Sequence, residues 1–283
     1  MTQRLRYAII GLGRMGGPMA SHAVRAGHDV IVYDVSNDAV AARVADGAIA
    51  ATSPNAAALG AACVSLVVFD DAQVLSVLEG PDGVLAALQP GAVVTIHTTV
   101  TLDTIHTAAA LGEQHGVAVL DAGISGGEEG AAKGTLVTML GGATEAVELA
   151  RPAMMSFSKE VLHAGPLGAG MALKLARNAA GYIMMAAAHE AMELAHHSGV
   201  DLKMLQHTIE ATGVLQQAMA PFMLGGPLPL ADTEVGGLRS ILEHTNKLAS
   251  KDLDQALDLA RRVDAVVPII AATREHFHSV TRL

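Results

Sequence analysis

The sequence predicts an α/β protein in two parts. The N-terminal part has the pattern of a doubly wound, mostly parallel sheet, and a long helix joins it to an all-helical C-terminal part. Short apolar or β-branched runs recur through the first half of the 283 residues, and helix-like segments separate most of them. From about residue 166 these runs stop, and an Ala-, Met- and Leu-rich helical pattern continues to the end. The alternation in the first half indicates strand–helix–strand units and a sheet covered on both faces.

Seven runs are the candidate strands of the sheet. Each is largely continuous in apolar residues, which is typical of parallel strands that are buried on both faces. Segments such as GGPMASHAVRAG and DAVAARVADG supply the helices between them. The predicted strands are YAIIG (7–11), DVIVYD (29–34), CVSLVVF (63–69), AVVTIH (92–97), VAVLDA (117–122), TLVTMLGG (135–142) and EVLHAG (160–165).

A break near residues 163–168 is the predicted domain boundary. Gly165, Pro166 and Gly168 interrupt the pattern there, so we expect one domain over 1–164 and an all-helical domain over 165–283. The first helix after the break extends to about His197, with Gly199 as its stop. Because roughly 30 residues is long for a helix within one globular domain, we expect it to cross into the other domain or a neighbouring subunit. The 213–237 segment shows no pattern that assigns a role.

Composition limits the class of protein. Hydrophobic residues make up 51% of the chain, which is enough for a large core. No apolar stretch approaches the roughly 20 residues that a membrane-spanning helix needs. The first residues, MTQRLRYAII, lack the long apolar region of a signal peptide, so we expect a soluble, cytoplasmic protein. A net charge of −10 with 2% aromatic residues argues against a nucleic-acid-binding surface.

Disulfide and metal chemistry are not expected. Cys63 is the single cysteine, and it lies in a predicted strand, where a small packed hydrophobe is the favoured interpretation. The thirteen histidines are scattered, and pairs such as His196 and His197 lack the spacing of metal ligands.

A glycine motif follows the first predicted strand. Gly11, Gly13 and Gly16 form G-x-G-x-x-G between that strand and a helix. The first glycine permits a tight turn, the second lets a pyrophosphate approach the backbone, and the third lets the helix pack closely with its N–H groups toward the phosphates. The next strand ends in Asp34, which can accept hydrogen bonds from an adenosine ribose and would repel a 2′-phosphate. The motif therefore predicts a Rossmann domain that binds NAD rather than NADP.

At GLGRMGGPMA the chain begins to resemble the β-hydroxyacid dehydrogenases, a family that includes 3-hydroxyisobutyrate dehydrogenase and tartronate semialdehyde reductase. Three further blocks continue the likeness over nearly the whole chain: DAGISGG (121–127), GPLGAGMALKLARN (165–178) and KDLDQALDLA (251–260). Some positions depart from the family pattern. Gly123 and Ile124 replace a usual Pro-Val, Arg177 replaces an asparagine, and His97 and Leu102 are unusual.

The resemblance implies the contacts of the cofactor. It assigns a hydroxyl near the nicotinamide to Thr99, although the adjacent Thr98 is a rival, and it has Lys251 reach the cofactor. The predicted cofactor-binding residues are Gly11, Leu12, Gly13, Arg14, Met15, Gly16, Asp34, Val68, Phe69, Thr99 and Lys251.

A lysine and an amide mark the predicted reaction centre. Lys174 and Asn178 are four residues apart and so share one face of an otherwise apolar helix. A lysine in a desolvated pocket has a lowered pKa and can exchange a proton near neutrality. Asn178 can donate a hydrogen bond to the same substrate oxygen. On the residues alone a solvated pair is the stronger interpretation, and the resemblance reverses that preference in favour of catalysis.

Two further groups are predicted to support the site. The Ser125–Gly127 segment offers a hydroxyl and flexible amides that can form a nest for a substrate carboxylate. On the residues alone a glycine-rich loop that turns into the next element is the stronger interpretation, and the resemblance favours carboxylate binding. Asp252 has Leu248, Ala249 and Ala256 as helical neighbours, which places it on an apolar stripe. A buried carboxylate there should be paired, and the resemblance gives it a supporting role, with a lysine as a candidate partner. The alternative is an acid at the edge of the stripe, exposed to water.

The sequence thus predicts an NAD-dependent oxidoreductase that transfers a hydride between nicotinamide and a small β-hydroxy acid, in the manner of 3-hydroxyisobutyrate dehydrogenase. Lys174 would exchange the hydroxyl proton. Two alternatives stay open: a reductase of another small semialdehyde, such as tartronate or succinate semialdehyde, and a noncatalytic dinucleotide-binding module. Expected partners are a small carboxylate substrate and a second copy of the chain, in a homodimer or homotetramer formed through the helical domain. Neither nucleic acid nor a membrane is an expected partner.

Overall fold

The computed structural model describes residues 4–214, 230 and 237–283. The chain divides into two compact units, 1–178 and 179–283, which we describe separately. The division falls within a long helix, whereas the boundary predicted from the sequence precedes that helix. Most of the 213–237 segment lies outside the described residues.

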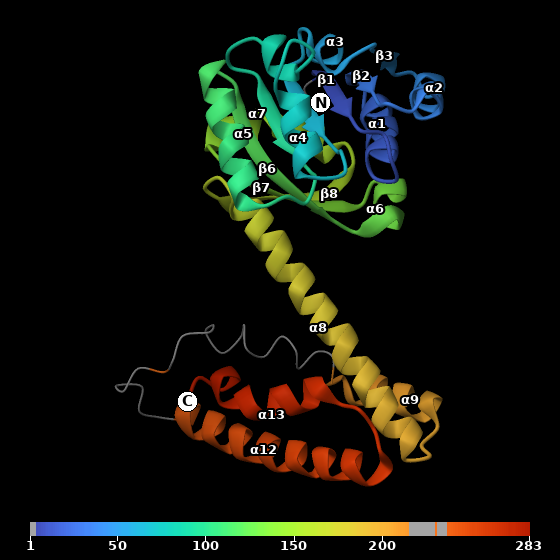
Figure 1. Ribbon diagram of the computed structural model, residues 1–283, viewed down its shortest axis with the longest axis vertical. Helices are drawn as coiled ribbons and strands as arrows, with labels where there is room; N and C mark the ends of the chain where they lie inside the picture. Colours follow the sequence, from blue (N-terminus) through green and yellow to red (C-terminus); the bar gives the residue numbers. More distant parts are fainter. Residues whose placement is uncertain (1–3, 215–229, 231–236) are drawn as a thin grey trace. The chain divides into compact units, whose positions relative to one another are not determined.

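The first unit is built around an eight-stranded sheet with the order β3-β2-β1-β4-β5-β6-β7-β8 (Figure 1). Neighbouring strands are parallel except for β6 and β7, which pair antiparallel. All seven predicted strands are present, and the eighth, β3, is a two-residue edge strand too short to give a hydrophobic run. The strands are β1 (Arg6–Ile10), β2 (Asp29–Tyr33), β3 (Ile49–Ala50), β4 (Cys63–Leu66), β5 (Val93–Ile96), β6 (Ala118–Ser125), β7 (Leu136–Gly141) and β8 (Ser158–Gly165).

Helices cover both faces of this sheet, as the continuous apolar strands predict. Along β1, Tyr7 and Ile9 enter one core and Ala8 and Ile10 enter the other, because successive side chains of a strand point to opposite faces. Helices α1, α6 and α7 contribute to the first core, and α3, α4 and α5 to the second. Their bounds are α1 (Gly16–Arg25), α2 (Asn37–Ala45), α3 (Pro54–Ala58), α4 (Asp71–Leu78), α5 (Leu102–Gln114), α6 (Gly127–Lys133) and α7 (Thr144–Met155), with a short 3₁₀ turn η1 (Val84–Ala86).

The long predicted helix is confirmed. Helix α8 (Ala169–His197) has 29 residues, and Gly199 follows it with a φ of +72°, a conformation that favours glycine at a helix end. Where the second unit is described, it contains the rest of α8 together with α9 (Leu202–Thr212), α12 (Gly237–Val263) and α13 (Pro268–Val280). Arg274 on α13 forms an ion pair with Asp254 on α12 at 2.7 Å.

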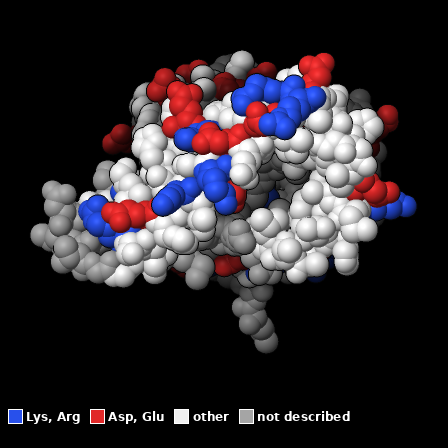
Figure 2. Space-filling model, turned by 90° about the horizontal axis from the view of Figure 1, so that it is seen from below, with Lys and Arg blue, Asp and Glu red and all other residues white. Residues whose placement is uncertain are grey.

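Charged side chains of opposite sign lie beside one another on the face shown in Figure 2. Some of the chain's charges form short-range pairs along single helices, such as Glu129 with Lys133 on α6 and Glu148 with Arg151 on α7. Within the described ranges, no helix is long and apolar enough to cross a membrane.

Candidate functional site

The glycine loop between β1 and α1 has the geometry that its three glycines predict. Gly11 has a φ of +92°, and a Cβ atom there would lie 2.4 Å from the carbonyl oxygen of Val67. A Cβ atom at Gly16 would lie 1.9 Å from the Gly11 oxygen, so the helix approaches the loop more closely than a side chain allows. At Gly13 a Cβ atom would meet nothing within 4 Å, which leaves the backbone open on that side. The loop thus has a tight turn, a close helix and an open approach for a phosphate.

The N-terminus of α1 is suited to an anion. The first turn contains no acidic residue, and the residue before it, Met15, makes no side-chain capping bond. Gly17 donates its N–H to the Gly13 oxygen and Pro18 has none, so the turn offers a phosphate the N–H of Gly16 and the positive end of the helix dipole.

Asp34 lies at the carboxyl end of β2, beside this loop. Its Oδ2 atom accepts a hydrogen bond from the Leu12 backbone N–H at 2.6 Å, and Oδ1 accepts one from Ser36 N–H at 2.8 Å. The spacing of 18 residues between Gly16 and Asp34 thus brings the carboxylate to the loop that would hold the pyrophosphate. The acid thus supports the loop through its hydrogen bond with the Leu12 N–H.

Of the other residues predicted to contact the cofactor, Arg14 belongs to the loop and Val68 lies against Gly11. Arg14 is exposed and forms an ion pair with Glu128 on α6 at 2.8 Å. Val68 is half-buried, and its carbonyl oxygen accepts a bond from Thr98 Oγ1 at 2.9 Å. Phe69 is 86% exposed. The hydroxyl of Thr98 is therefore committed to the backbone, which leaves its neighbour as the better candidate for the site.

Lys174 and Thr99 come together in the structure. Lys174, on the second turn of α8, is only 8% exposed, and its Nζ atom donates a hydrogen bond to Thr99 Oγ1 at 2.6 Å. Thr99 follows β5 in the segment that leads into α5. Burial lowers the pKa of Lys174, because the charged ammonium is poorly hydrated there. Within the part of the chain that the structure describes, no carboxylate forms a salt bridge with this lysine.

A buried polar network lies at the end of β5, next to this pair. The His97 ring contacts Ser65 Oγ at 2.9 Å, and Ser65 Oγ contacts the Tyr7 hydroxyl at 2.6 Å. His97 is 2% exposed, and burial lowers its pKa to about 3, with a smaller contribution from the charge on Lys174. The imidazole is therefore neutral at ordinary pH. Among the described residues its Nδ1 atom has no hydrogen-bond partner of good geometry, although the Ala122 backbone works against the lowering of the His97 pKa.

The residues predicted to hold the substrate lie at the end of β6 and along α8. Gly126 and Gly127 have φ values of +131° and +63°, which turn the chain from β6 into α6. Ser125, just before them, is half-buried. Asn178 is half-buried, and its Oδ1 atom accepts a 3.3 Å bond from Arg177, so its NH₂ group stays available as a donor.

The prediction that Asp252 is buried is wrong. Lys251 and Asp252 lie on α12, in the second unit, and their side chains are 60% and 68% exposed. They pair with each other at 3.2 Å, so Asp252 does have a lysine partner, but at the surface. The exposed alternative therefore describes this acid.

Asp121 has a position that the sequence does not reveal. It lies in β6 with no exposed surface, and its carboxylate accepts hydrogen bonds from the N–H groups of Gly168 and Met171, each at 2.6 Å. The acid thus caps the start of the helix that carries Lys174. An acid within an apolar strand is a signal that could have drawn attention to it, because a buried carboxylate requires partners.

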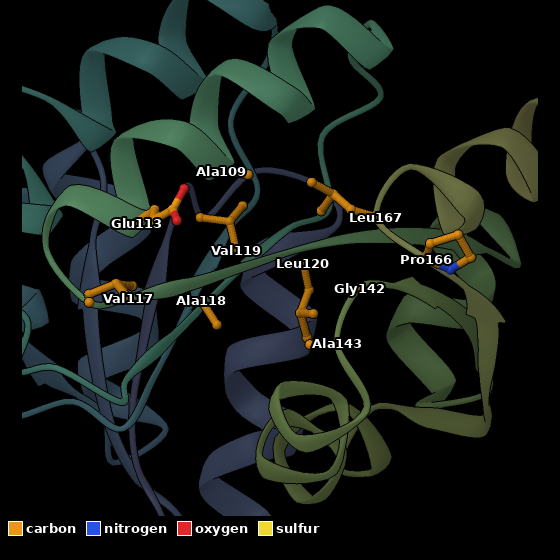
Figure 3. Close-up of a pocket in the computed structure, with 11 residues that line it drawn as sticks. Ala109, Glu113, Val117, Ala118, Val119, Leu120, Gly142, Ala143, Pro166 and Leu167 are labelled. Carbon is orange, nitrogen blue, oxygen red and sulfur yellow. The ribbon is translucent and has the colours of Figure 1, made fainter.

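A hollow of about 550 Å³ lies elsewhere on the first unit, between α5, β6 and the residues after β8 (Figure 3). Its lining is mostly apolar, with Val119 and Leu167 turned toward it and Glu113 at its edge. None of the predicted site residues lines it.

Cys63 has no role in the site. Burial raises the pKa of its thiol to about 12, so the thiol stays protonated near neutral pH. Among the residues described, no three His, Cys, Asp or Glu side chains gather as a candidate metal site.

A glycine loop that follows β1 and opens a helix, beside an acid at the end of β2, in a sheet covered on both faces, defines a dinucleotide-binding α/β domain. Residues 6–165 match the family model of the NAD-binding domain of 6-phosphogluconate dehydrogenase.

Relatives cover nearly the whole chain. An uncharacterised oxidoreductase of Mycobacterium tuberculosis is 37% identical over 277 residues, which are 95% of this chain and 90% of the relative. The 3-hydroxyisobutyrate dehydrogenase of Pseudomonas aeruginosa is 32% identical over 95% of this chain and 90% of its own length. The NAD-dependent L-serine dehydrogenase of the same organism is 39% identical over 71% of this chain and 67% of its own length.

A solved structure from Mycobacterium avium, described as that of an oxidoreductase, superposes with a TM-score of 0.86 at 33% identity and covers 99% of both chains. The chain belongs to the β-hydroxyacid dehydrogenase family. It is an NAD-dependent oxidoreductase.

Proposed function

We propose that this oxidoreductase transfers a hydride between nicotinamide and the carbinol carbon of a small β-hydroxy acid. The observation that carries the proposal is the position of Lys174, an almost fully buried lysine whose Nζ atom has a hydroxyl, and among the described residues no carboxylate, as its partner. A carboxylate partner would keep the lysine protonated, whereas burial favours the neutral amine. A neutral amine can take a proton from a substrate hydroxyl, and the ammonium can return it.

The chain's own groups would then divide the work at the substrate. In oxidation Lys174 accepts the hydroxyl proton, and in reduction it donates that proton to the carbonyl oxygen. The NH₂ group of Asn178 orients the same oxygen, since Arg177 occupies the other end of the amide. Ser125 and the amides of Gly126 and Gly127 hold the carboxylate in a nest of consecutive N–H groups.

The cofactor would be held by the first unit. Gly13 and the N-terminus of α1 would receive the pyrophosphate, and Asp34 the adenosine ribose, where its charge disfavours a 2′-phosphate. Bound NAD supplies the hydride acceptor, and Thr99, Val68 and Phe69 would surround its nicotinamide half. Lys251 as a cofactor contact stays a prediction from the resemblance.

Two substrates are favoured by relatives, 3-hydroxyisobutyrate and L-serine, and both are β-hydroxy acids. The test is the rate of NADH formation from NAD with a panel of substrates. The panel contains these two acids, the hydroxy acids that form when tartronate semialdehyde and succinate semialdehyde are reduced, and simple alcohols that lack the carboxylate. We expect turnover with at least one β-hydroxy acid and none with the alcohols. Equal rates with the alcohols would contradict the carboxylate nest, and no turnover with any acid would leave the noncatalytic module as the better interpretation.

We also propose that the chain works as a homodimer or homotetramer, assembled through the helical part, in the cytoplasm. The support is an apolar surface on α8, where Tyr182, Ile183 and Met185 are each at least 60% exposed. Exposed apolar side chains that follow one another along a helix are typical of an interaction surface, and a second copy of the chain presents the same helix.

A further inference from the structure

The way in which α8 rests on β6 carries an inference about the site. Asp121 and Gly123 are two residues apart on β6, so they point to the same face of the sheet. Asp121 binds the N–H groups of Gly168 and Met171 at the start of α8. One turn later the helix places Lys174 beside Gly123, so the first two turns of α8 follow this face of the strand.

Where α8 packs on β6 and β7, three glycines stand at positions that have no room for a side chain. A Cβ atom at Gly141, the β7 partner of Asp121, would lie 2.3 Å from Asp121 Oδ1. One at Gly170 would lie 2.3 Å from the Met139 carbonyl oxygen and 2.9 Å from Asp121 Oδ2. A Cβ atom at Gly123 would lie 2.9 Å from Lys174 Cβ and 3.0 Å from its Cδ. Glycines therefore allow the helix to lie directly against the strand.

We propose that Asp121 is the positioning residue of the reaction centre: its carboxylate holds the first turn of α8 on β6 and thereby keeps Lys174 out of water, in reach of Thr99. This inference rests on the proposed function of Lys174. It assigns a role to an acid that touches neither substrate nor cofactor and acts through the lysine alone.

The charges around Lys174 make the effect of Asp121 measurable. Burial is the cause of the lowered pKa of Lys174. On β5 the neighbouring titratable group is His97, which is neutral, and on α8 itself it is the exposed Arg177. On β6 it is Asp121, whose two oxygens are both engaged by backbone N–H groups. Losing its charge alone would lower the pKa of the lysine, whereas admitting water by releasing the helix would raise it. The two effects have opposite signs.

The test compares the wild type with Asp121→Asn in the full-length protein without substrate. The variant keeps the size of the side chain, but it turns an NH₂ group toward one backbone N–H and so leaves a buried donor unpaired. Acetylation of Lys174 by acetic anhydride is followed by mass spectrometry over a range of pH. We expect the midpoint of labelling to move to higher pH, and below the midpoint the reactive amine falls about tenfold for each pH unit of that movement. An unchanged or lower midpoint overturns the proposal.

Glu190→Gln is the matched control. Glu190 is also a buried carboxylate that caps a helix, because it accepts bonds from Ile269 and Ile270 N–H at the start of α13. We expect this variant to leave the midpoint of Lys174 labelling unchanged. An equal change of the midpoint in Glu190→Gln would show that the midpoint reports general loosening, which would also overturn the proposal.

A second variant keeps the test decisive if Asp121→Asn does not fold, as judged by far-UV circular dichroism. Gly123→Ala places a Cβ atom against the stem of Lys174 without touching the carboxylate. We expect the midpoint of Lys174 labelling to rise in the same way. An unchanged midpoint would contradict the proposal that close packing of α8 on β6 keeps Lys174 out of water. Because labelling requires no substrate, this result is independent of turnover. Full activity in a variant that lacks Lys174 would refute the proposed function and leave the labelling result standing.

Discussion

Lys174 has an amine whose charged form water would normally stabilise, but only 8% of the residue is exposed. Its partner is a hydroxyl, which accepts the hydrogen bond from Nζ but does not compensate the charge of an ammonium. Burial thus lowers the pKa of this lysine, which moves it in the direction that a proton acceptor near neutral pH requires. A solvated lysine on an alanine-rich helix would lack this lowering of its pKa.

His97 gives a prediction about stability. The unfolded chain protonates this histidine below a pKa of about 6.5, whereas the folded chain resists protonation down to about 3. Between these values the unfolded state binds the additional proton, so the contribution to stability is complete above pH 6.5 and is lost as the pH falls. From pH 7 to pH 5 we expect the wild type to lose about 2 kcal/mol more than His97→Gln, in proportion to the 1.5 pH units below 6.5. Urea unfolding at both pH values measures the difference, and identical losses would contradict it.

Chemistry and spacing together single out residues that the structure brings close to one another. Separate motifs point to Lys174 and Thr99, and the two residues meet in the structure. Helical neighbours alone predict that Asp252 lies on a buried stripe, but its side chain is exposed. The prediction failed because neighbours along a helix do not show what packs against that helix. The role of Asp121 depends on a contact between residues 47 and 50 positions apart, which local pattern does not contain.

At the scale of elements, a buried carboxylate that caps a helix N-terminus connects α8 to a neighbouring element in each unit. In the first unit, Asp121 caps α8 itself. In the second unit, Glu190 on α8 caps α13, with bonds of 2.5 and 2.8 Å to two N–H groups. A charged acceptor strengthens both kinds of capping bond, and burial raises the cost of losing it.

The cap that Glu190 provides for α13 predicts the effect of removing this side chain. Glu190→Ala leaves two N–H groups at the start of α13 without their acceptors, so we expect the free energy of unfolding to fall by about 2 kcal/mol. Glu193→Ala is the control on the same helix, since that side chain is 38% exposed and contacts His197 at 3.5 Å. We expect it to change stability by less than about 0.5 kcal/mol. Thermal unfolding of both variants decides the matter, and equal losses would contradict the buried cap.

Element types and order could be predicted because hydrophobic runs, glycines and helix stops are local signals. The long helix and its end near His197 are confirmed, as are the seven main strands. The two-residue β3 could not be found, because it exists through pairing with β2 rather than through its own sequence. The antiparallel pairing of β6 with β7 likewise depends on how the chain returns through α6.

At the scale of the whole molecule, the proposed assembly makes a prediction about mass. We expect wild-type protein at micromolar concentration to have the mass of a dimer or tetramer in light scattering. Met185→Glu places a charge on the exposed apolar surface of α8 and should shift the mass toward the monomer. His207→Glu, at an exposed position of α9, is the control and should leave the mass unchanged. A monomeric wild type would contradict the assembly.

The central claim is that Lys174 handles the proton of an NAD-dependent hydride transfer. The most direct measurement is the rate of NADH formation by wild type and Lys174→Ala, with the best β-hydroxy acid of the panel, together with the affinity of each protein for NAD by calorimetry. Lys174 is not among the residues assigned to the phosphates or the ribose, so NAD affinity should change little. Turnover should fall by about 10²-fold or more, as expected when a general base is removed. Turnover within a few-fold of the wild type, with NAD still bound, would contradict the account.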